Sequence, residues 1–282
     1  MPVLPVSLID PIWEQFSVFL PDRARVSPTH PLGCHRQRVP DRVVFDRVVD
    51  ALVHGAGYER IAMPGCSDRT IRRRLGEWAA AGLAELLQQV VLRQYDRLIG
   101  LELTEVAVDG CMTKAPSGGE VAGKSPVDRG KQGLKRSVLV DGNGVPLSLV
   151  VVGANRHDGP LLAETLQGLD VWGPIPGGTT VHLDRGYDSQ QTRRVLDDLG
   201  LQGQIAVKGM PAPVQAGKRW VVERTHAWMN GFGKLRRCTE RRAVVARFYL
   251  YQAAAVVTTR CLIDAARTRY RWPMRPTTRR LK

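Results

Sequence analysis

The sequence predicts an α/β protein in which one mixed sheet is flanked by helices and preceded by a small helical region. Hydrophobic residues recur at helical spacing over residues 41–98, and from residue 104 the spacing changes to that of β-strands. Three strands come first and are followed by strands that alternate with helices, an order typical of one mixed sheet with helices on both faces. With 282 residues, 43% of them hydrophobic, the chain is long enough to bury a substantial core.

The first predicted region, residues 1–40, contains seven prolines and no sustained periodicity. We expect a loosely ordered lead-in with one short helix near residues 12–19. A helical domain over residues 41–98 follows. It comprises a helix from Asp41 to the glycines at 55 and 57, a short helix over residues 58–62, a helix over residues 68–80 with Ser67 as its N-cap, and a linking helix over residues 83–95.

Three short helices with a tight turn before the last resemble a helix-turn-helix unit. The last of them carries four arginines that we expect to lie away from its apolar stripe, as a helix in the major groove of DNA requires. The alternative is a solvated basic face on an ordinary three-helix bundle. The four candidate DNA-binding residues are Arg69, Arg72, Arg73 and Arg74.

The strands begin with residues 105–109, an apolar run that ends on Asp109. Residues 137–140 and 147–152 predict a hairpin around an Asp-Gly-Asn-Gly turn. Between the first strand and this hairpin, residues 115–133 are rich in Gly, Ser, Pro and Lys and predict a mobile loop. The rest of the order is a helix over residues 160–169, a strand over 180–184 that ends on Asp184, a helix over 189–199, a strand over 204–207 and a long helix from about Lys218.

Basic residues are concentrated in the last quarter of the chain. Residues 205–282 carry 18 Lys and Arg against 3 Asp and Glu, whereas residues 1–204 carry 23 and 24. Such a one-sided field attracts polyanions, so nucleic acid is the expected partner. Over residues 218–247 the basic residues are interleaved with apolar and aromatic ones, which predicts ordered helix. Residues 269–282 predict a disordered basic tail.

Several other classes of protein are disfavoured. No apolar run approaches the roughly 20 residues that cross a bilayer, and the first residues do not form a signal peptide, so we expect a cytoplasmic protein without a membrane partner. Five scattered cysteines without a C-x-x-C pair favour reduced thiols over disulfides or a zinc site. The Gly-Lys-Ser at residues 123–125 lacks the spacing of a phosphate-binding loop, so no nucleotide cofactor is implied.

Three acids are candidates for chemistry. Asp109 and Asp184 each end an apolar strand, where a carboxylate leaves the core and opens into the crevice at the sheet edge. Like charges this close raise one another's pKa unless a cation lies between them, and hard oxygen ligands select Mg²⁺ or Mn²⁺. Glu223 is the only acid between residues 205 and 239, on a helix where Arg219 lies one turn before it. Taken singly, each aspartate is better explained as a turn cap, but together with Glu223 and the strong positive charge that explanation is disfavoured.

These residues resemble a known family. The order of Asp109, Asp184 and Glu223, together with the strings Val-Asp-Gly at 108–110, Ala-Asn-Arg-His-Asp at 154–158, Asp-Arg-Gly-Tyr at 184–187 and Arg-x-x-x-Glu-Arg-Thr-x-Ala-Trp at 219–228, resembles the DDE transposases of bacterial insertion sequences. The spacings of 75 and 39 residues between the acids resemble members without a large inserted domain. Some relatives have a Lys seven residues after the Glu, where this chain has Asn230; a basic residue follows at Lys234.

The resemblance implies an RNase H-like mixed sheet flanked by helices over residues 99–247, preceded by the helix-turn-helix domain and followed by a C-terminal helix and tail over residues 248–282. It implies that Asp109, Asp184 and Glu223 are catalytic and hold two divalent ions, Mg²⁺ or Mn²⁺, for DNA cleavage at element ends and strand transfer into target DNA. It also implies at least a dimer on DNA, bound to the bacterial nucleoid. Phosphates would contact Arg219, Arg224, Lys234, Arg236 and Arg237.

Three alternatives remain open on the sequence alone. The first is a nuclease of the same fold without strand transfer, the second a catalytically silent DNA-binding repressor, and the third an RNA-directed hydrolase. Three minor expectations go with the main hypothesis. Trp220 and Trp228 are expected in the core, Asp158 as a helix N-cap rather than a further ligand, and His226 as a structural histidine.

Overall fold

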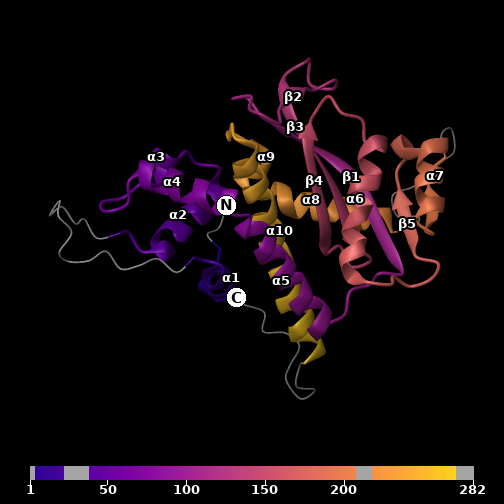
Figure 1. Cartoon of the computed structure of the whole chain (residues 1–282), viewed down its shortest axis with the longest axis horizontal. Coiled ribbons are helices and arrows are strands. Elements are labelled where there is room, and N and C mark those ends of the chain that lie inside the picture. The colour runs from indigo at the N-terminus through magenta and orange to yellow at the C-terminus, as the bar shows by residue number, and fades with distance from the viewer. Residues whose placement is uncertain (1–3, 22–37, 208–217, 271–282) are drawn as a thin grey trace, which may run out of the picture.

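The computed structural model describes residues 4–21, 38–207 and 218–270 of the chain. Helices make up its N-terminal part, at the left of Figure 1. Ser67 caps the fourth helix as expected, because its Oγ accepts a hydrogen bond from the Thr70 N–H at 3.3 Å. The second to fifth helices confirm the predicted ones, whereas the first begins earlier than expected. They are α1 (Val6–Val18), α2 (Asp41–His54), α3 (Tyr58–Ile61), α4 (Asp68–Ala80) and α5 (Leu83–Leu98).

One mixed sheet forms the centre of the second part. Its strands lie in the order β4, β3, β1, β5, β6, and β2 continues the edge of β3 beyond β4. β1, β3 and β4 are antiparallel, whereas β5 and β6 run parallel to β1. This strand order confirms the expected RNase H-like sheet. The strands are β1 (Glu105–Lys114), β2 (Gly123–Lys124), β3 (Gln132–Asp141), β4 (Pro146–Gly153), β5 (Thr180–Leu183) and β6 (Gln202–Ile205).

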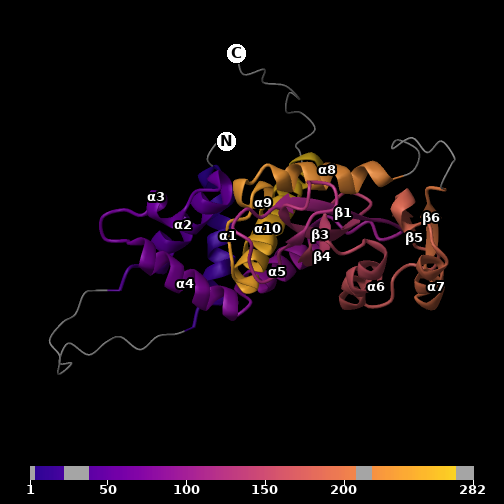
Figure 2. The ribbon, with the colours of Figure 1, turned by 90° about the horizontal axis from the view of Figure 1, so that it is seen from above.

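Helices cover both faces of the sheet. Figure 2 shows α8 on one side, and α6 and α7 on the other. The single predicted helix over residues 160–169 is a short α-helix between two 3-10 turns. The elements are η1 (Gly159–Leu161), α6 (Leu162–Leu166), η2 (Gln167–Trp172), η3 (Arg185–Tyr187), α7 (Gln190–Asp198), α8 (Arg219–Asn230), α9 (Gly233–Arg236) and α10 (Ala243–Arg269).

The first strand is longer than the sequence predicts. It does not end at Asp109 but continues to Lys114, because β3 pairs with it along its length, from Val106 opposite Asp141 to Lys114 opposite Gly133. The region expected to be a mobile loop carries β2 and is tied to the start of α10, where Glu120 accepts a hydrogen bond from the Ala243 N–H at 2.8 Å. The expected basic tail lies outside the described residues from position 271 onward.

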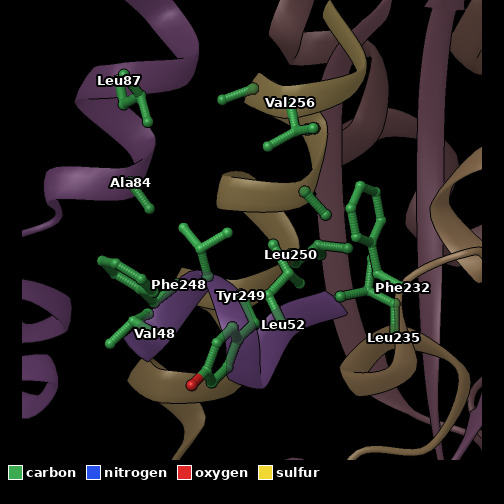
Figure 3. Packing of buried hydrophobic residues seen from close by; sticks show 14 of the residues in the cluster. Val48, Leu52, Ala84, Leu87, Phe232, Leu235, Phe248, Tyr249, Leu250 and Val256 are labelled. Atoms are coloured by element: carbon green, nitrogen blue, oxygen red, sulfur yellow. The ribbon is translucent and has the colours of Figure 1, made fainter. Parts of the chain in front are cut away.

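A shared hydrophobic core joins the helical part to the sheet. α10 packs along α5 and against α1, α4 and β4, between the two parts of the chain in Figure 1. Phe248 of α10 stacks edge-on against Phe16 of α1, with ring centroids 6.3 Å apart. Figure 3 shows Phe248, Tyr249 and Leu250 packed among side chains from both parts. The predicted domain boundaries stay a prediction, although the C-terminal helix is packed between the neighbouring parts.

The helical part also touches the end of the α8 region through two glycines. Gly55 ends α2 with φ +66°, and a methyl group on it would lie 2.9 Å from the Gly233 carbonyl carbon. A methyl group on Gly233 would in turn overlap the backbone of His54 and Gly55. The two backbones therefore meet without an intervening side chain. Within the described ranges, even the longest helix, α10, does not combine the length and apolarity that crossing a bilayer requires.

Candidate active site

Strand register places Asp109 and Asp184 side by side. β1 and β5 pair in parallel, with Glu105 opposite Thr180 and Ala107 opposite His182. The same offset, continued for two residues, sets Asp184 beside Asp109, just past the end of β5. Because side chains alternate along strands, both acids lie on the sheet face that α8 covers. The expectation that the two strands bring these carboxylates together is therefore supported by the register, although Asp109 lies within its strand.

The α8 helix carries Glu223 over this face. His182 fixes its start, since His182 Nδ1 accepts a hydrogen bond from the Lys218 N–H at 3.3 Å. Thr225 fixes its middle, since its hydroxyl donates to the Gly144 carbonyl at 2.6 Å in the β3–β4 turn. Glu223 is exposed on the helix, and His226, less than one turn later, lies with Nε2 3.7 Å from Asp109 Oδ2. The helix thus crosses directly over Asp109.

The electrostatic effect of this arrangement is concentrated on Asp109. Burial, together with the negative charges of Asp184, Asp158 and Glu223, raises the pKa of its carboxyl to about 7, while the hydrogen bond from the Gly110 N–H opposes the shift. Only 27% of the Asp109 side chain is exposed. The other two predicted acids, Asp184 and Glu223, therefore both act on Asp109. A cluster of carboxylates that destabilise one another has the donor chemistry of a divalent cation site.

The side chains do not yet stand at ligand distance. Across the described ranges, no three His, Cys, Asp or Glu side chains lie close enough together to hold one metal ion. Asp184 turns back on its own backbone, where Oδ1 accepts a hydrogen bond from the Gly186 N–H at 2.8 Å. Asp184 and Glu223 thus raise the pKa of Asp109 without standing at ligand distance from a common point. The assignment of the three acids as catalytic ligands stays a prediction.

Asp158 is not the helix N-cap that the sequence predicts. It occupies the N-cap position of η1, but its side chain makes no capping bond. Instead, Oδ2 accepts a hydrogen bond from Lys135 Nζ at 2.8 Å, while the buried Oδ1 has no partner among the residues that the structure describes. Oδ1 lies against Gly110, where any side chain would overlap it. Asp158 is therefore a fourth acid beside Asp109, and its place in the string at 154–158 was the available signal.

Arg136 is a neighbour of the site that no motif in the sequence identifies. It is 3% exposed, on β3 opposite Cys111. Its Nη2 donates to Asn230 Oδ1 at 2.5 Å and lies 3.2 Å from Cys111 Sγ, and its Nη1 lies 3.4 Å from the Leu235 carbonyl oxygen. Burial lowers the pKa of this guanidinium. Arg136 therefore ties β1 and β3 to the end of α8, with no carboxylate among its hydrogen-bond partners in the described ranges.

The α4 arginines do not share one environment. Arg69, Arg72 and Arg73 are exposed, as expected. Arg74 is fully buried and pairs with Asp41 of α2, so the expectation that it faces DNA is wrong. Its position on α4 directs the Arg74 side chain toward α2, where it pairs with Asp41, 33 residues earlier in the chain.

The basic residues of α8 and α9 divide in the same way. Lys234 is 3% exposed, pairs with Glu240 and lies over the rings of Tyr58 and Tyr249, so the expectation that it contacts DNA is wrong. Its long side chain enters the core because a buried acid receives it. Arg236 and Arg237 are exposed and line an open groove of about 870 Å³ together with Lys114, Lys131 and Asn230.

Arg224 lies between two tryptophans. Its guanidinium carbon is 4.5 Å from the Trp220 ring and 4.7 Å from the Trp228 ring, and Nη2 donates to the Asn143 carbonyl at 2.5 Å. The tryptophans are 41% and 37% exposed, so the expectation that they lie in the core is wrong. Spacing of four residues along the helix stacks the three side chains on one outer face.

The chain is similar to several known transposases. Residues 101–211 match the family described as "Transposase DDE domain", a span that includes Asp109 and Asp184 and ends before Glu223. The chain is 39% identical over 137 residues to a putative transposase for insertion sequence element IS402 from Burkholderia cepacia, covering 45% of this chain and 64% of that protein. It is 32% identical over 130 residues to the transposase for insertion sequence element IS1106 from Neisseria meningitidis serogroup B, covering 44% and 43%.

The aligned region thus spans less than two thirds of the length of either relative. Among solved structures, the chain is similar to the Mos1 mariner paired end complex with Mn, at 11% identity and a TM-score of 0.32, over 96% of this chain and 89% of the other. It is similar to the catalytic domain of Mos1 mariner transposase at 12% identity and a TM-score of 0.31, over 63% and 89%. With scores this low, the strand order remains the evidence for the fold.

Proposed function

We propose, from the premise that this chain carries a DDE domain of the bacterial insertion-sequence transposases, that it is a DNA transposase. It would cleave DNA at the ends of an insertion sequence and join the freed ends to target DNA. The observation that supports the proposal is that the charges of Asp184 and Glu223 both raise the pKa of Asp109, which lies under a helix whose charged side chains other than Glu223 are basic. The protein would act in the cytoplasm on chromosomal DNA.

Asp109, Asp184 and Glu223 would hold divalent cations, two Mg²⁺ or two Mn²⁺. When bound, such ions supply positive charge that stabilises the attacking and leaving oxygens at a phosphodiester. The carboxylates supply hard oxygen donors, and their mutual repulsion supports the proposal because a cation between them relieves it. Asp184 must release the Gly186 N–H to join such a site, and Glu223 is free to do so because it is exposed.

DNA would follow the basic surface around the acids. Arg219 and Arg224 flank Glu223 on α8, and Arg236, Arg237, Lys114 and Lys131 continue the positive charge through the groove at the far end of that helix. Charge of this kind neutralises phosphates without reading sequence. The exposed α4 arginines, Arg69, Arg72 and Arg73, would contact the element end. Bringing two ends together requires at least two copies of the chain on DNA.

The test uses purified full-length protein, Mg²⁺ and labelled duplexes that carry the DNA flanking its own gene. Nicked ends and products joined to a target duplex are expected with wild type. Asp109→Ala is expected to bind the duplex with unchanged affinity and to make neither product. Nicks without joining would instead support a nuclease of this fold. Binding without any nick would support a silent DNA-binding protein, and preference for an RNA-containing duplex would support an RNA-directed hydrolase.

A further inference from the structure

A buried histidine lies beside Asp109 at the site. His226 is 6% exposed, and within the described part of the chain its ring nitrogens lie near the Asp109 backbone without forming a well-aligned hydrogen bond to any group. Buried polar atoms in proteins are nearly always paired, because an unpaired one loses its hydrogen bonds to water without replacement. A nearby group that could accept the ring N–H of His226 would therefore explain why a histidine is buried at this position.

Asp109 is that group. His226 Nε2 lies 3.7 Å from Asp109 Oδ2, which is too long for a hydrogen bond but within reach of a small rotation of either side chain. The imidazole can carry a proton on Nε2, and a carboxylate accepts it. Arg136, which lies on the same face of the sheet, offers only further N–H donors and therefore cannot accept that proton.

The position of His226 on α8 gives its contact with Asp109 a second consequence. His226 follows Glu223 by three residues on α8, so the two side chains lie on neighbouring positions of one face of that helix. A bond from His226 to Asp109 would thus fix β1 and α8 relative to each other, and with them two of the three acids. In carboxylate and histidine metal sites, groups that orient the ligands in this way strongly affect cation affinity.

We propose that His226 is a positioning residue, whose ring N–H donates to the Asp109 carboxylate and orients it for the cations that Asp109, Asp184 and Glu223 would hold. The inference rests on the proposed function, because it takes Asp109 as a cation ligand. His226 itself contacts neither cation nor DNA in this scheme. Its effect is on the orientation of Asp109 and on the distance between Asp109 and Glu223.

Two variants separate the hydrogen bond from packing. His226→Phe keeps a ring in the buried space and removes the donor, whereas His226→Gln keeps an N–H donor at the corresponding position. Met229→Leu, a volume-conserving change on the buried face of the same helix, is the matched control. The measurements are the dissociation constant for Mn²⁺ by calorimetry and the melting temperature without added cation, both on the full chain.

His226→Phe is expected to weaken Mn²⁺ binding by about tenfold or more while the cation-free protein melts no lower than wild type, because an unpaired polar group has been removed. His226→Gln and Met229→Leu are expected to bind Mn²⁺ within about threefold of wild type. Wild-type affinity in His226→Phe overturns the inference. So does equal weakening in the Phe and Gln variants accompanied by lower melting temperatures, which indicates packing.

Failure of the proposed function gives a different result. If wild type binds no Mn²⁺, or binds it equally well after Asp109→Asn, the cation site itself is absent and the role of His226 falls with it. If Asp109→Asn abolishes Mn²⁺ binding and His226→Phe does not change it, the cation site stands and only the positioning role is overturned.

Discussion

At the scale of single residues, Asp109 combines burial and like charge in a way that makes its ionisation depend on what binds to it. Its pKa in the folded chain is raised to about 7, above the ordinary aspartate value. A carboxyl with a raised pKa contributes stability that is fully present at low pH and is lost as pH rises through the folded value. The cation-free protein is therefore expected to become less stable between about pH 4 and pH 7 on account of this one group.

Asp109→Asn removes that titration. At pH 8 and without divalent cations, the variant is expected to exceed wild type in free energy of unfolding by about 2–4 kcal/mol, and near pH 4 the difference should vanish. Chemical denaturation at both pH values in a chelating buffer measures it. Asp128→Asn, which removes an acid that is not among the charges acting on Asp109, is the control. A difference that is equal at both pH values would show that Asp109 does not titrate as described.

Residue-scale predictions from sequence succeeded where strand order decides position. Asp109 and Asp184 end up neighbours because parallel pairing has a fixed register. They failed where a distant partner decides. Arg74 and Lys234 are buried because Asp41 and Glu240 receive them, and Asp158 is drawn from its capping role by Lys135. Helical periodicity shows which residues share a face, but it does not show what the fold places opposite that face.

At the scale of elements, α4 offers an internal comparison between an exposed and a buried arginine. Arg69→Ala is expected to leave stability within about 0.5 kcal/mol and to make the dependence of DNA affinity on salt shallower by about one unit of logarithmic slope, because one phosphate contact is lost. Arg74→Ala is expected to destabilise the chain by about 3 kcal/mol, since Asp41 loses its buried partner.

Thermal melts and DNA titrations at several salt concentrations measure both effects. For Arg74→Ala, the dependence of DNA affinity on salt is measured at a temperature where the variant is folded. That dependence is expected to equal that of wild type. A wild-type slope in Arg69→Ala would argue that α4 does not lie on DNA, and would favour the simpler reading of an exposed basic face.

The α8 helix carries a second element-scale prediction at its Trp220, Arg224 and Trp228 stack. Arg224→Ala is expected to cost about 1–2 kcal/mol of stability, because two ring contacts and a charged hydrogen bond are lost. Arg224→Lys keeps the charge without the planar fork, so it should lose similar stability while keeping the salt slope of DNA binding. If the lysine variant is as stable as wild type, the stack does not stabilise the helix.

At the scale of the whole molecule, α10 is packed into the shared core rather than set apart in a C-terminal domain. Phe248→Ala is expected to destabilise the chain by about 3–5 kcal/mol, since a fully buried ring that contacts Phe16 and the surrounding core leaves a cavity. Unfolding should remain one cooperative transition. Hydrogen exchange should then increase in α5 and in β4 alike; an increase confined to the helical part would show that the two parts unfold independently.

The overall architecture was accessible from sequence because its pattern is local. The change from helical to strand periodicity near residue 104, and the alternation of strands and helices after the hairpin, determine the layers. The length of β1 and the burial of α10 were not accessible, because both depend on partners far along the chain. β3 extends β1 beyond its apolar run, and α10 owes the burial of its residues between Val245 and Thr259 to α5, α1, α4 and the sheet.

The contact between Gly55 and Gly233 bears on the spacing between the DNA sequence that the protein would recognise and the position that it would cut. The two backbones touch with no side chain between them, so the end of α2 and the start of α9 are in direct contact. We expect this contact to hold the helices that would bind an element end at one distance from the acids that would cut it. The number of base pairs between the recognised sequence and the cut would then be a property of the fold. Gly233→Ala, which wedges the two surfaces open, should shift or blur the cleavage position on a labelled duplex; a cut that stays sharp and in place would show that the spacing is set elsewhere.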